Sequence, residues 1–430
     1  MIGVVAVALI AVVVAATGGN GDVAAVTDPI PTATSAPPTG TTSQDPPQPS
    51  VTTAPPSPTT APAVIVTSRV VALPAELELV TGRWPTDWTK RTIDLDELRV
   101  GILSSDPRDA IRPLDSPAYE SVAAAAGWLE GRELGILFDY EDSARFYPLR
   151  ILTSHEVVNT EIDGFPYVIT YCPLCNTAVA FPRELNGQVL RFGVSGLLRN
   201  SDLVMWDNIT NSLWQQTTGE AIVGEFAGEQ LEFLPTALVT WDDFAGSHPD
   251  GEVLSRDTGF GFDYGRNGYV GYTSRAGPYP SFFDDEIDDR FRALERVVGV
   301  RVGDAAKAYP FSIIAVERTV NDVFAGQPVT VWWGAADTAD PLDSNTTAGG
   351  AGIGTGVAYV PVVDGQLLTF TAVGDKTYSD AETGSTWNIL GKATAGPLAG
   401  RELALAIHQN EFWFAWSAFN AGSPVYEGSQ

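Results

Sequence analysis

Apolar and polar residues alternate along most of this chain with the short period that predicts β-strands. Short apolar runs such as PYVITYC, ALVTW, PVTVWW and LLTFTAV are bounded by Gly, Pro, Asn and Asp, as is typical of strands. Long helical periods are rare. The best helix candidates are LDELRVGI and SPAYESVAAAAGWLEG, both between residues 67 and 130. The pattern therefore predicts a mainly β (α+β) fold.

Two parts of the chain match each other in sequence. The run DYEDSARFYPLRILTSHEVVNTEIDGFPYVITYC from Asp139 aligns with RVGDAAKAYPFSIIAVERTVNDVFAGQPVTVWWG from Arg301, at a constant offset of 162. Further matches follow in the same order: Trp214 with Trp387, Gly228 with Gly400 and Trp241 with Trp416. Because internal repeats reveal architecture directly, we expect two tandem, internally repeated β-rich halves with the same strand order.

The N-terminal region differs in composition from the rest. Residues 1–16, MIGVVAVALIAVVVAA, carry no charge and run into small residues, which suits a signal peptide or a retained membrane anchor. From about Pro29 to Ala63 a Pro/Thr/Ser stretch follows, which cannot bury enough apolar surface to offset its ordering entropy. We expect an extracytoplasmic protein, either secreted or tethered to a membrane at the cell surface through its N-terminus.

These observations divide the chain into six segments. They are 1–27, a signal peptide or membrane anchor; 28–66, a disordered linker; 67–130, an extension that packs on the first half; 131–250, the first repeat half with a Cys/His site; 251–295, a connector; and 296–426, the second half without the site.

The charge balance narrows the choice of partners. The formal net charge is −28, from 53 acidic and 25 basic residues. A nucleic acid would meet a repulsive field, so we expect no nucleic-acid partner. The acidity maintains solubility in a salty or cell-surface setting and identifies no ligand. A small molecule and a cell-surface partner both stay open.

Only two cysteines are present, Cys172 and Cys175, in the run YCPLCN. An apolar strand leads into this C-x-x-C and a second apolar stretch follows it, as in a metal knuckle at a strand turn. Asn176 can take the left-handed conformation that such a turn requires.

The hairpin register supplies a third ligand. An Asp-Gly turn at 163–164 predicts a two-residue hairpin loop, and counting outward from it places His155 opposite Cys172. Directly opposed residues share one face. The predicted site is Cys172, Cys175 and His155, holding copper or zinc. Two further candidate ligands are Met205, a soft ligand that favours copper but also suits a core, and His248, which also suits a turn. The second half has Glu317, Gly334 and Asp337 at the positions of His155, Cys172 and Cys175.

Two other interpretations stay open. The cysteines can be buried free thiols, form a disulfide or act as a thiol-disulfide oxidoreductase, although the βαβ context that lowers the thiol pKa in such enzymes is missing. The aromatic-rich halves can also form a non-catalytic module that binds a cell-surface partner. No phosphate loop, G-x-S-x-G elbow or H-E-x-x-H motif is present, so no enzyme activity is assigned. A metal with an open coordination position would allow redox or hydrolytic chemistry.

Several motifs together resemble those of a prokaryotic family, domain of unknown function 3179. They are YPL from Tyr147, HEVVN from His155, YCPLC from Tyr171, FGVSG from Phe192, SDLVM from Ser201 and ETGS from Glu382. The resemblance covers about residues 135–425. It departs at Asn176, where the family commonly has Gly, and near Asn420, where many members have a His-Pro pair. It implies an exported protein and supplies no activity.

Overall fold

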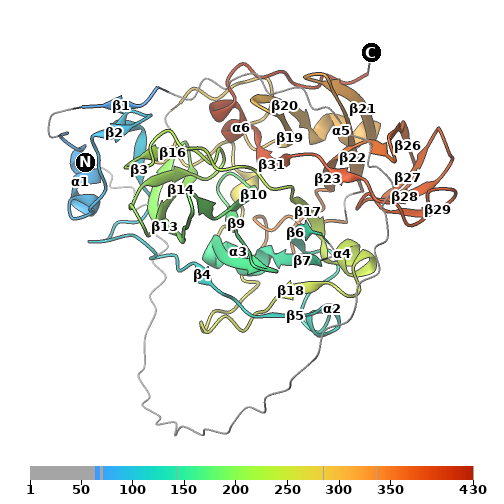
Figure 1. The fold of residues 1–430 in the computed structure, drawn as a ribbon, viewed down its shortest axis with the longest axis horizontal. Helices are drawn as coiled ribbons and strands as arrows, with labels where there is room; N and C mark the ends of the chain where they lie inside the picture. Colours follow the sequence, from blue (N-terminus) through green and yellow to red (C-terminus); the bar gives the residue numbers. More distant parts are fainter. Residues whose placement is uncertain (1–62, 68–70, 142, 284, 336, 430) are drawn as a thin grey trace, which may run out of the picture. The chain divides into compact units, whose positions relative to one another are not determined.

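The computed structural model of the chain describes residues 63–67, 71–141, 143–283, 285–335 and 337–429. The predicted signal peptide or anchor and the predicted linker up to residue 62 lie outside these ranges. The described part consists mainly of short strands in several mostly antiparallel sheets, with a few helices of at most seven residues (Figure 1). The mainly β prediction is confirmed. None of the helices in these ranges is long and apolar enough to cross a membrane.

The first half, drawn mainly in green in Figure 1, is built on three sheets. The strands of these sheets that have counterparts in the second half are ordered β17-β6-β7, β10-β9-β8 and β13-β14-β15-β16. We call this arrangement the frame. The elements are β6 Leu134–Tyr140, β7 Ser143–Pro148, α3 Leu149–His155, β8 Val157–Ile162, β9 Phe165–Cys172, β10 Thr177–Pro182, β11 Glu184–Leu185, β12 Gln188–Val189, β13 Phe192–Arg199, β14 Asp202–Asp207, β15 Leu213–Gln215, β16 Ala221–Val223, β17 Ala237–Thr240 and α4 Trp241–Ser247.

The second half, in orange to red, repeats this frame. Its strand orders are β31-β19-β20, β23-β22-β21 with β30 beyond β23, and β26-β27-β28-β29. The elements are β19 Arg296–Val302, β20 Ala305–Pro310, α5 Phe311–Glu317, β21 Thr319–Phe324, β22 Gln327–Gly334, β23 Thr355–Val360, β24 Val362–Val363, β25 Gln366–Leu367, β26 Phe370–Gly374, β27 Thr377–Asp380, β28 Thr386–Asn388, β29 Ala393–Ala395, β30 Ala404–Leu405, β31 His408–Phe412 and α6 Trp413–Phe419.

The two halves also share individual hydrogen bonds. The indole N–H of Trp214 donates to Asp207 Oδ2 at 3.0 Å, and the indole N–H of Trp387 donates to Asp380 Oδ2 at 2.9 Å. Each carboxylate also accepts bonds from the backbone of the turn that follows it. The bounds of β6 to β9, including α3, recur in β19 to β22 at the offset of 162. The predicted duplication is therefore confirmed.

One sequence match is displaced in the structure. Helices α4 and α6 each follow the last strand of their half directly and each span seven residues. Trp241 opens α4 and Trp413 opens α6, so Trp241 corresponds to Trp413. The sequence match of Trp241 with Trp416 is wrong by three residues, because an amphipathic helix repeats its apolar positions after about one turn.

The N-terminal extension and the connector add strands to the first half. Strands β1 and β2 continue the sheet beyond β16, β3 pairs with β13, β4 with β8, and β18 with β7 and β5. Although the predicted linker ends at residue 66, its last two residues form β1. The elements are β1 Ile65–Val66, α1 Ala75–Thr81, β2 Lys90–Arg91, η1 Leu95–Glu97, β3 Leu98–Val100, β4 Leu114–Asp115, β5 Tyr119–Ser121, α2 Val122–Ala125, β18 Glu252–Leu254 and η2 Tyr272–Ser274.

The two helices predicted in the extension are mostly absent. In LDELRVGI only Leu95–Glu97 is helical, as a 3₁₀ turn with a capping box between Asp94 and Glu97, and Leu98–Val100 pairs with β13. In SPAYESVAAAAGWLEG the helix is only Val122–Ala125. Pairing with a neighbouring sheet overrides helix propensity in the first run, and Gly127 closely follows the short helix in the second.

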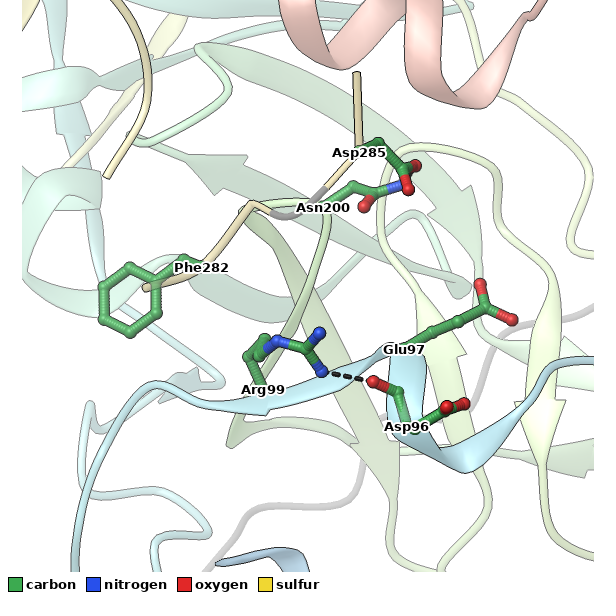
Figure 2. A pocket seen from close by; sticks show the side chains of 6 residues that line it. All are labelled: Asp96, Glu97, Arg99, Asn200, Phe282 and Asp285. Atoms are coloured by element: carbon green, nitrogen blue, oxygen red, sulfur yellow. Dashed lines mark hydrogen bonds between the residues drawn. The ribbon is translucent and has the colours of Figure 1, made fainter. Parts of the chain in front are cut away.

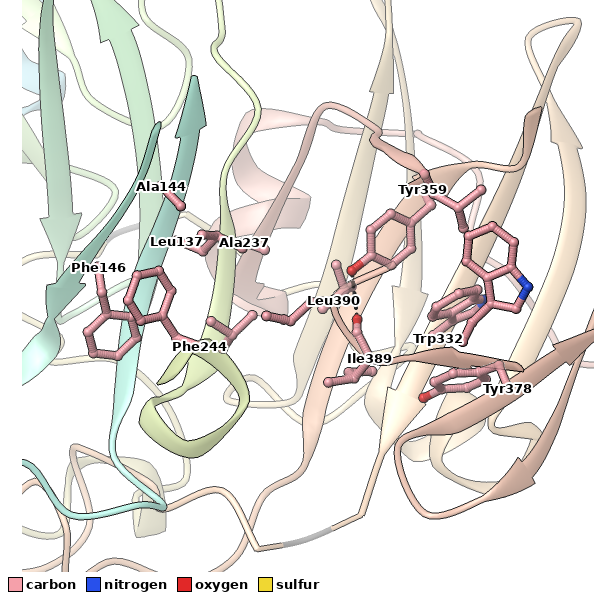
Figure 3. Close-up of a cluster of buried hydrophobic side chains, with 14 of the residues drawn as sticks. Leu137, Ala144, Phe146, Ala237, Phe244, Trp332, Tyr359, Tyr378, Ile389 and Leu390 are labelled. Atoms are coloured by element: carbon pink, nitrogen blue, oxygen red, sulfur yellow. Dashed lines mark hydrogen bonds between the residues drawn. The ribbon is translucent and has the colours of Figure 1, made fainter. Parts of the chain in front are cut away.

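One apolar cluster joins the two halves. Figure 3 shows Phe146 and Phe244 of the first half on one side and Trp332 and Tyr378 of the second half on the other, with Leu390 among the residues between them. All belong to the same set of contacting buried side chains. The halves therefore share a core.

Candidate metal centre

The two cysteines lie on the short connection between β9 and β10. Cys172 ends β9, and Cys175 lies in the turn before β10. Asn176 has a φ of 57°, which confirms the predicted left-handed residue. The second half supports this knuckle, because the N–H of Phe412 donates to the carbonyl of Cys175 at 2.9 Å. Both cysteines are free thiols and are almost fully buried.

A carboxylate from another hairpin completes the group. The ligand atoms of Cys172, Cys175 and Asp202 all lie within 4.8 Å of one another. Asp202 opens β14, directly after the β13–β14 turn, in which Asn200 and Ser201 both have positive φ values. The carbonyls of this turn face the thiols: Cys172 Sγ lies 3.6 Å from Ser201 O, and Cys175 Sγ lies 3.9 Å from Asn200 O. The turn thus brings one carboxylate and two carbonyls to the sulfur pair.

Only one oxygen of the Asp202 carboxylate is satisfied by the protein. Oδ2 accepts hydrogen bonds from Gln215 Nε2 at 2.6 Å and from Thr217 N at 3.0 Å. Oδ1 is buried without a hydrogen-bond partner among the described residues. A buried carboxylate oxygen without a partner is costly, and a bound cation would remove this cost.

Burial keeps the acidic groups of the site protonated to unusually high pH. It raises the pKa of Cys172, raises that of Cys175 well above its ordinary value, and raises that of Asp202 to about 7. The charges of nearby acidic residues, Asp202, Glu156 and Glu411, raise the thiol pKa values further. Glu411 also raises the pKa of Asp202, whereas hydrogen bonds from Thr217, Gln215 and Cys172 lower it. The two thiols of such a cluster ionise readily only when a cation joins them.

Glu156 adds a second carboxyl beside the three ligands. Burial and the charge of Asp202 raise its pKa to about 8, and Tyr269 Oη lies 3.5 Å from its Oε1. Glu156 has a φ of 60° and follows the last residue of α3. The left-handed residue ends the helix and turns the chain into β8.

The same turn explains why the prediction for His155 is wrong. The hairpin register is as counted, from Ile162 opposite Phe165 to Val157 opposite Thr170. The strand begins only at Val157, however, and His155 is the last residue of α3. His155 therefore does not join the cysteines in the group of candidate ligands.

His155 has other partners. Its Nδ1 lies 2.6 Å from the carbonyl of Arg112 and its Nε2 lies 2.5 Å from the hydroxyl of Tyr264. The ring also contacts Phe260 and Phe262 of the connector. Both ring nitrogens are engaged, so His155 has a structural role in holding the connector against the first half.

The two further candidate ligands lie in different surroundings. Met205 is fully buried in β14 and belongs to the apolar cluster that also contains both cysteines. His248 is not grouped with the cysteines; its ring lies near Asp139 and Glu402. The structure thus separates His248 from the cysteine site.

A surface pocket lies outside the turn that covers the thiols. It has a volume of about 220 Å³ and is lined by Asp96, Glu97, Arg99, Asn200, Phe282 and Asp285 (Figure 2). Asn200 donates through Nδ2 to Asp285 at 2.9 Å, while its carbonyl faces Cys175 on the other side of the turn. Phe282 holds the turn, because its carbonyl accepts the N–H of Ser201 at 2.8 Å.

Comparison with protein families gives one match. A family model described as "Protein of unknown function (DUF3179)" matches residues 108–423, about three quarters of the 430-residue chain. The chain belongs to the DUF3179 family. No curated protein and no solved structure matches the chain. The family match confirms the resemblance seen in the motifs and leaves the function to be argued from the site.

Sequence reasoning missed Asp202 and Glu156 as residues of the candidate site. Both residues stand in the motifs that carried the resemblance, SDLVM and HEVVN. Each is an acidic residue beside an apolar strand run, and both are buried. A carboxylate in such a run is expected to have a partner, because charged residues are almost never fully buried without one.

Proposed function

We propose that this DUF3179 protein is an extracytoplasmic metal-binding protein that holds one zinc ion through Cys172, Cys175 and Asp202. The observation that carries the proposal is the meeting of three buried ligand atoms within 4.8 Å of one another. The unpartnered Oδ1 of Asp202 supports it, because this oxygen is free to bind an ion. Export and an N-terminal membrane tether are part of the proposal and rest on the composition of residues 1–63.

The donor set favours zinc over copper. Two thiolates and a carboxylate combine soft and hard ligands, which suits the borderline ion Zn²⁺, whereas Cu⁺ prefers thiolate and thioether ligands. Met205 is the thioether that a copper site would use. Three protein ligands leave a fourth zinc position for water or another small ligand. A metal analysis that finds copper instead of zinc would therefore contradict the choice of zinc.

Burial argues against a thiol-disulfide exchange enzyme. Cys172 is 2 % exposed and Cys175 is 0 % exposed, and burial raises the pKa of both thiols. Catalytic thiols are partly exposed and have a lowered pKa. The two cysteines have the surroundings of metal ligands rather than of nucleophiles.

The acidic pocket in Figure 2 fits the proposal as an approach route for the ion. Asp96, Glu97 and Asp285 line it, and a cleft lined by acidic groups attracts cations. The overall charge of −28 adds to this attraction and supports the expectation that no nucleic acid is a partner.

Metal analysis of tag-free protein, prepared under anaerobic conditions, tests the proposal. We expect Cys172→Ala/Cys175→Ala and Asp202→Asn each to lose one equivalent of zinc relative to the natural protein. The matched control is His155→Ala, because His155 is bonded to Arg112 and Tyr264 instead; it should keep this equivalent. Retention of full zinc by the cysteine variant would refute the site, and copper in place of zinc would refute the assignment of the metal.

A further inference from the structure

A second group of metal-ligating side chains lies where the two halves meet. Asp139 is on β6, His248 follows α4, and Glu402 precedes β30 of the second half. Their ligand atoms all lie within 4.8 Å of one another. The group shares no residue with the cysteine site.

His248 is the unusual member of this group. Its side chain is only 7 % exposed, yet neither ring nitrogen has a hydrogen-bond partner among the described residues. A buried polar group without a partner destabilises a fold. The protein contacts around the ring therefore leave its nitrogens unsatisfied.

Packing and backbone hydrogen bonds hold the imidazole in place. Its ring stacks on Phe244 with the centroids 5.1 Å apart. The N–H of His248 donates to the carbonyl of Phe244 at 2.8 Å, and its carbonyl accepts the N–H of Gly251 at 3.0 Å. The ring is therefore held by backbone and packing contacts, with its nitrogens available.

The spacing of the atoms matches shared coordination better than a hydrogen bond. His248 Nε2 lies 3.6 Å from Asp139 Oδ2, which is long for a hydrogen bond. Two ligand atoms that each lie about 2.0–2.1 Å from one tetrahedral zinc ion are about 3.3 Å apart. A small adjustment of the half-exposed carboxylates would reach this geometry.

A lysine partly neutralises Glu402, one of the two carboxylates. Lys392 Nζ lies 3.7 Å from Glu402 Oε2 and donates to the carbonyl of Ser247 at 3.3 Å. Burial raises the pKa of Glu402, and the charge of Asp139 raises it further while Lys392 and His248 lower it. Lys392 thus offsets part of the charge of Glu402, while the ligand atoms of Glu402, Asp139 and His248 all lie within 4.8 Å of one another.

We propose that Asp139, His248 and Glu402 form a second metal site, which binds a divalent transition ion such as Zn²⁺ and links the two halves. One imidazole and two carboxylates are ligands that zinc accepts, and three protein ligands leave a position open. Because Asp139 and His248 belong to the first half and Glu402 to the second, a bound ion stabilises the contact between the halves.

Zinc titration of the metal-free full-length chain by calorimetry tests this site separately from the cysteine site. We expect two equivalents in the natural protein, one in Cys172→Ala/Cys175→Ala, and one in His248→Asn. The variant that combines these substitutions should bind none. In the cysteine-free background, zinc should raise the melting temperature, and His248→Asn should abolish this rise.

Two further variants keep the test decisive if His248→Asn fails to fold. Glu402→Gln changes a side chain that is 43 % exposed and should remove the same equivalent without unfolding the protein. Asp250→Asn is the matched control, because this exposed carboxylate lies two residues after His248 and outside the group; it should keep the equivalent.

If Glu402→Gln and His248→Asn bind as much zinc as the cysteine-free parent, the second site does not exist. If only the zinc equivalent assigned to Cys172 and Cys175 is missing, the proposed function is wrong but this second site stands. The two proposals can therefore be refuted independently.

Discussion

The two halves have the same frame but different residues at one corresponding position. In the first half Cys172 ends β9, whereas in the second half Gly334 ends the corresponding strand β22. A Cβ atom added at Gly334 would lie 2.6 Å from Cγ of Lys376, so the lysine chain fills the space beside the strand. Lys376 forms ion pairs with Asp243 at 2.7 Å and with Asp337 at 3.1 Å. Where the first half gathers thiols and carboxylates, the second half has a lysine.

The residue that follows the helix of each half, α3 or α5, also differs: it is acidic in the first half and basic in the second. Glu156 follows α3 with a φ of 60°, and Arg318 follows α5 with a φ of 65°. The backbone conformation is thus the same at both positions, while an acidic side chain in the first half is replaced by a basic one in the second. The comparison teaches that the repeated fold does not require the site, because the second half has Lys376 and Arg318 where the first half has its acidic cluster.

Loop length accounts for the remaining difference. Four residues, 173–176, connect β9 to β10, but twenty residues, 335–354, connect β22 to β23. The short connection returns Cys175 to the side of Cys172. We infer that the site depends on the short knuckle as well as on the two sulfurs.

The largest expected effect is on zinc binding. Cys172→Ser removes one thiolate, and we expect zinc affinity at this site to fall more than about 100-fold, since even loss of an outer partner of a metal ligand costs 10–100-fold. The matched change in the second half, Gly334→Ser, should leave zinc affinity unchanged. Competition with a coloured chelator measures both. Equal zinc affinities of the two variants would contradict the assignment of this zinc site to the first half alone.

The next effect is on stability and belongs to the second half. Lys376→Met leaves Asp243, which is 13 % exposed, without its cation. We expect the free energy of unfolding to fall by about 3 kcal/mol, in the range for removal of one partner of a buried ion pair. Urea unfolding measures the change. Lys392→Met is the control, since its ion pair with Glu402 is longer and more exposed; an equally large loss there would contradict the comparison.

A smaller effect is the pH dependence of the metal-free protein. The folded-state pKa of Glu156 is raised to about 8 from an ordinary value of 4.5. Between these values the unfolded chain has released a proton that the folded protein still holds, so a rise in pH favours the unfolded state. We expect Glu156 to lower the free energy of unfolding by about 2 kcal/mol between pH 5.5 and pH 7, and Glu156→Gln to remove this contribution. Urea unfolding at both pH values tests it, and an unchanged slope in the variant would argue against the raised pKa.

The smallest effect concerns the approach of the ion. Asp285→Asn removes one negative charge from the pocket in Figure 2, and we expect the zinc association rate to fall about two- to threefold at low salt, with little change at high salt. Stopped-flow mixing with zinc measures the rate. A rate that does not respond to salt would exclude this pocket as the route.

Much of the fold was predictable, because matching residues of the two halves recur at a constant spacing along the chain. The constant offset of 162 placed β6 to β9 on β19 to β22, and the Asp-Gly turn gave the register of β8 and β9. The short helices of the extension were not predictable, since pairing of Leu98–Val100 with β13 decides the first of them.

The candidate site was predictable only in part. The knuckle with Cys172, Cys175 and left-handed Asn176 follows from local sequence. Asp202 reaches the sulfurs only because a separate hairpin, β13–β14, folds against the knuckle, and periodicity carries no information on such a contact. His155 failed as a ligand because counting along a strand cannot show where the strand gives way to a helix.

Zinc-edge X-ray absorption on tag-free His248→Asn protein, loaded with one equivalent of zinc, tests the central claim most directly. This variant isolates the site at Cys172, Cys175 and Asp202. The account predicts two sulfur atoms at about 2.3 Å and oxygen ligands at about 2.0–2.2 Å from the zinc. A zinc ion without sulfur ligands, or a protein whose two cysteines form a disulfide and bind no zinc, would contradict it.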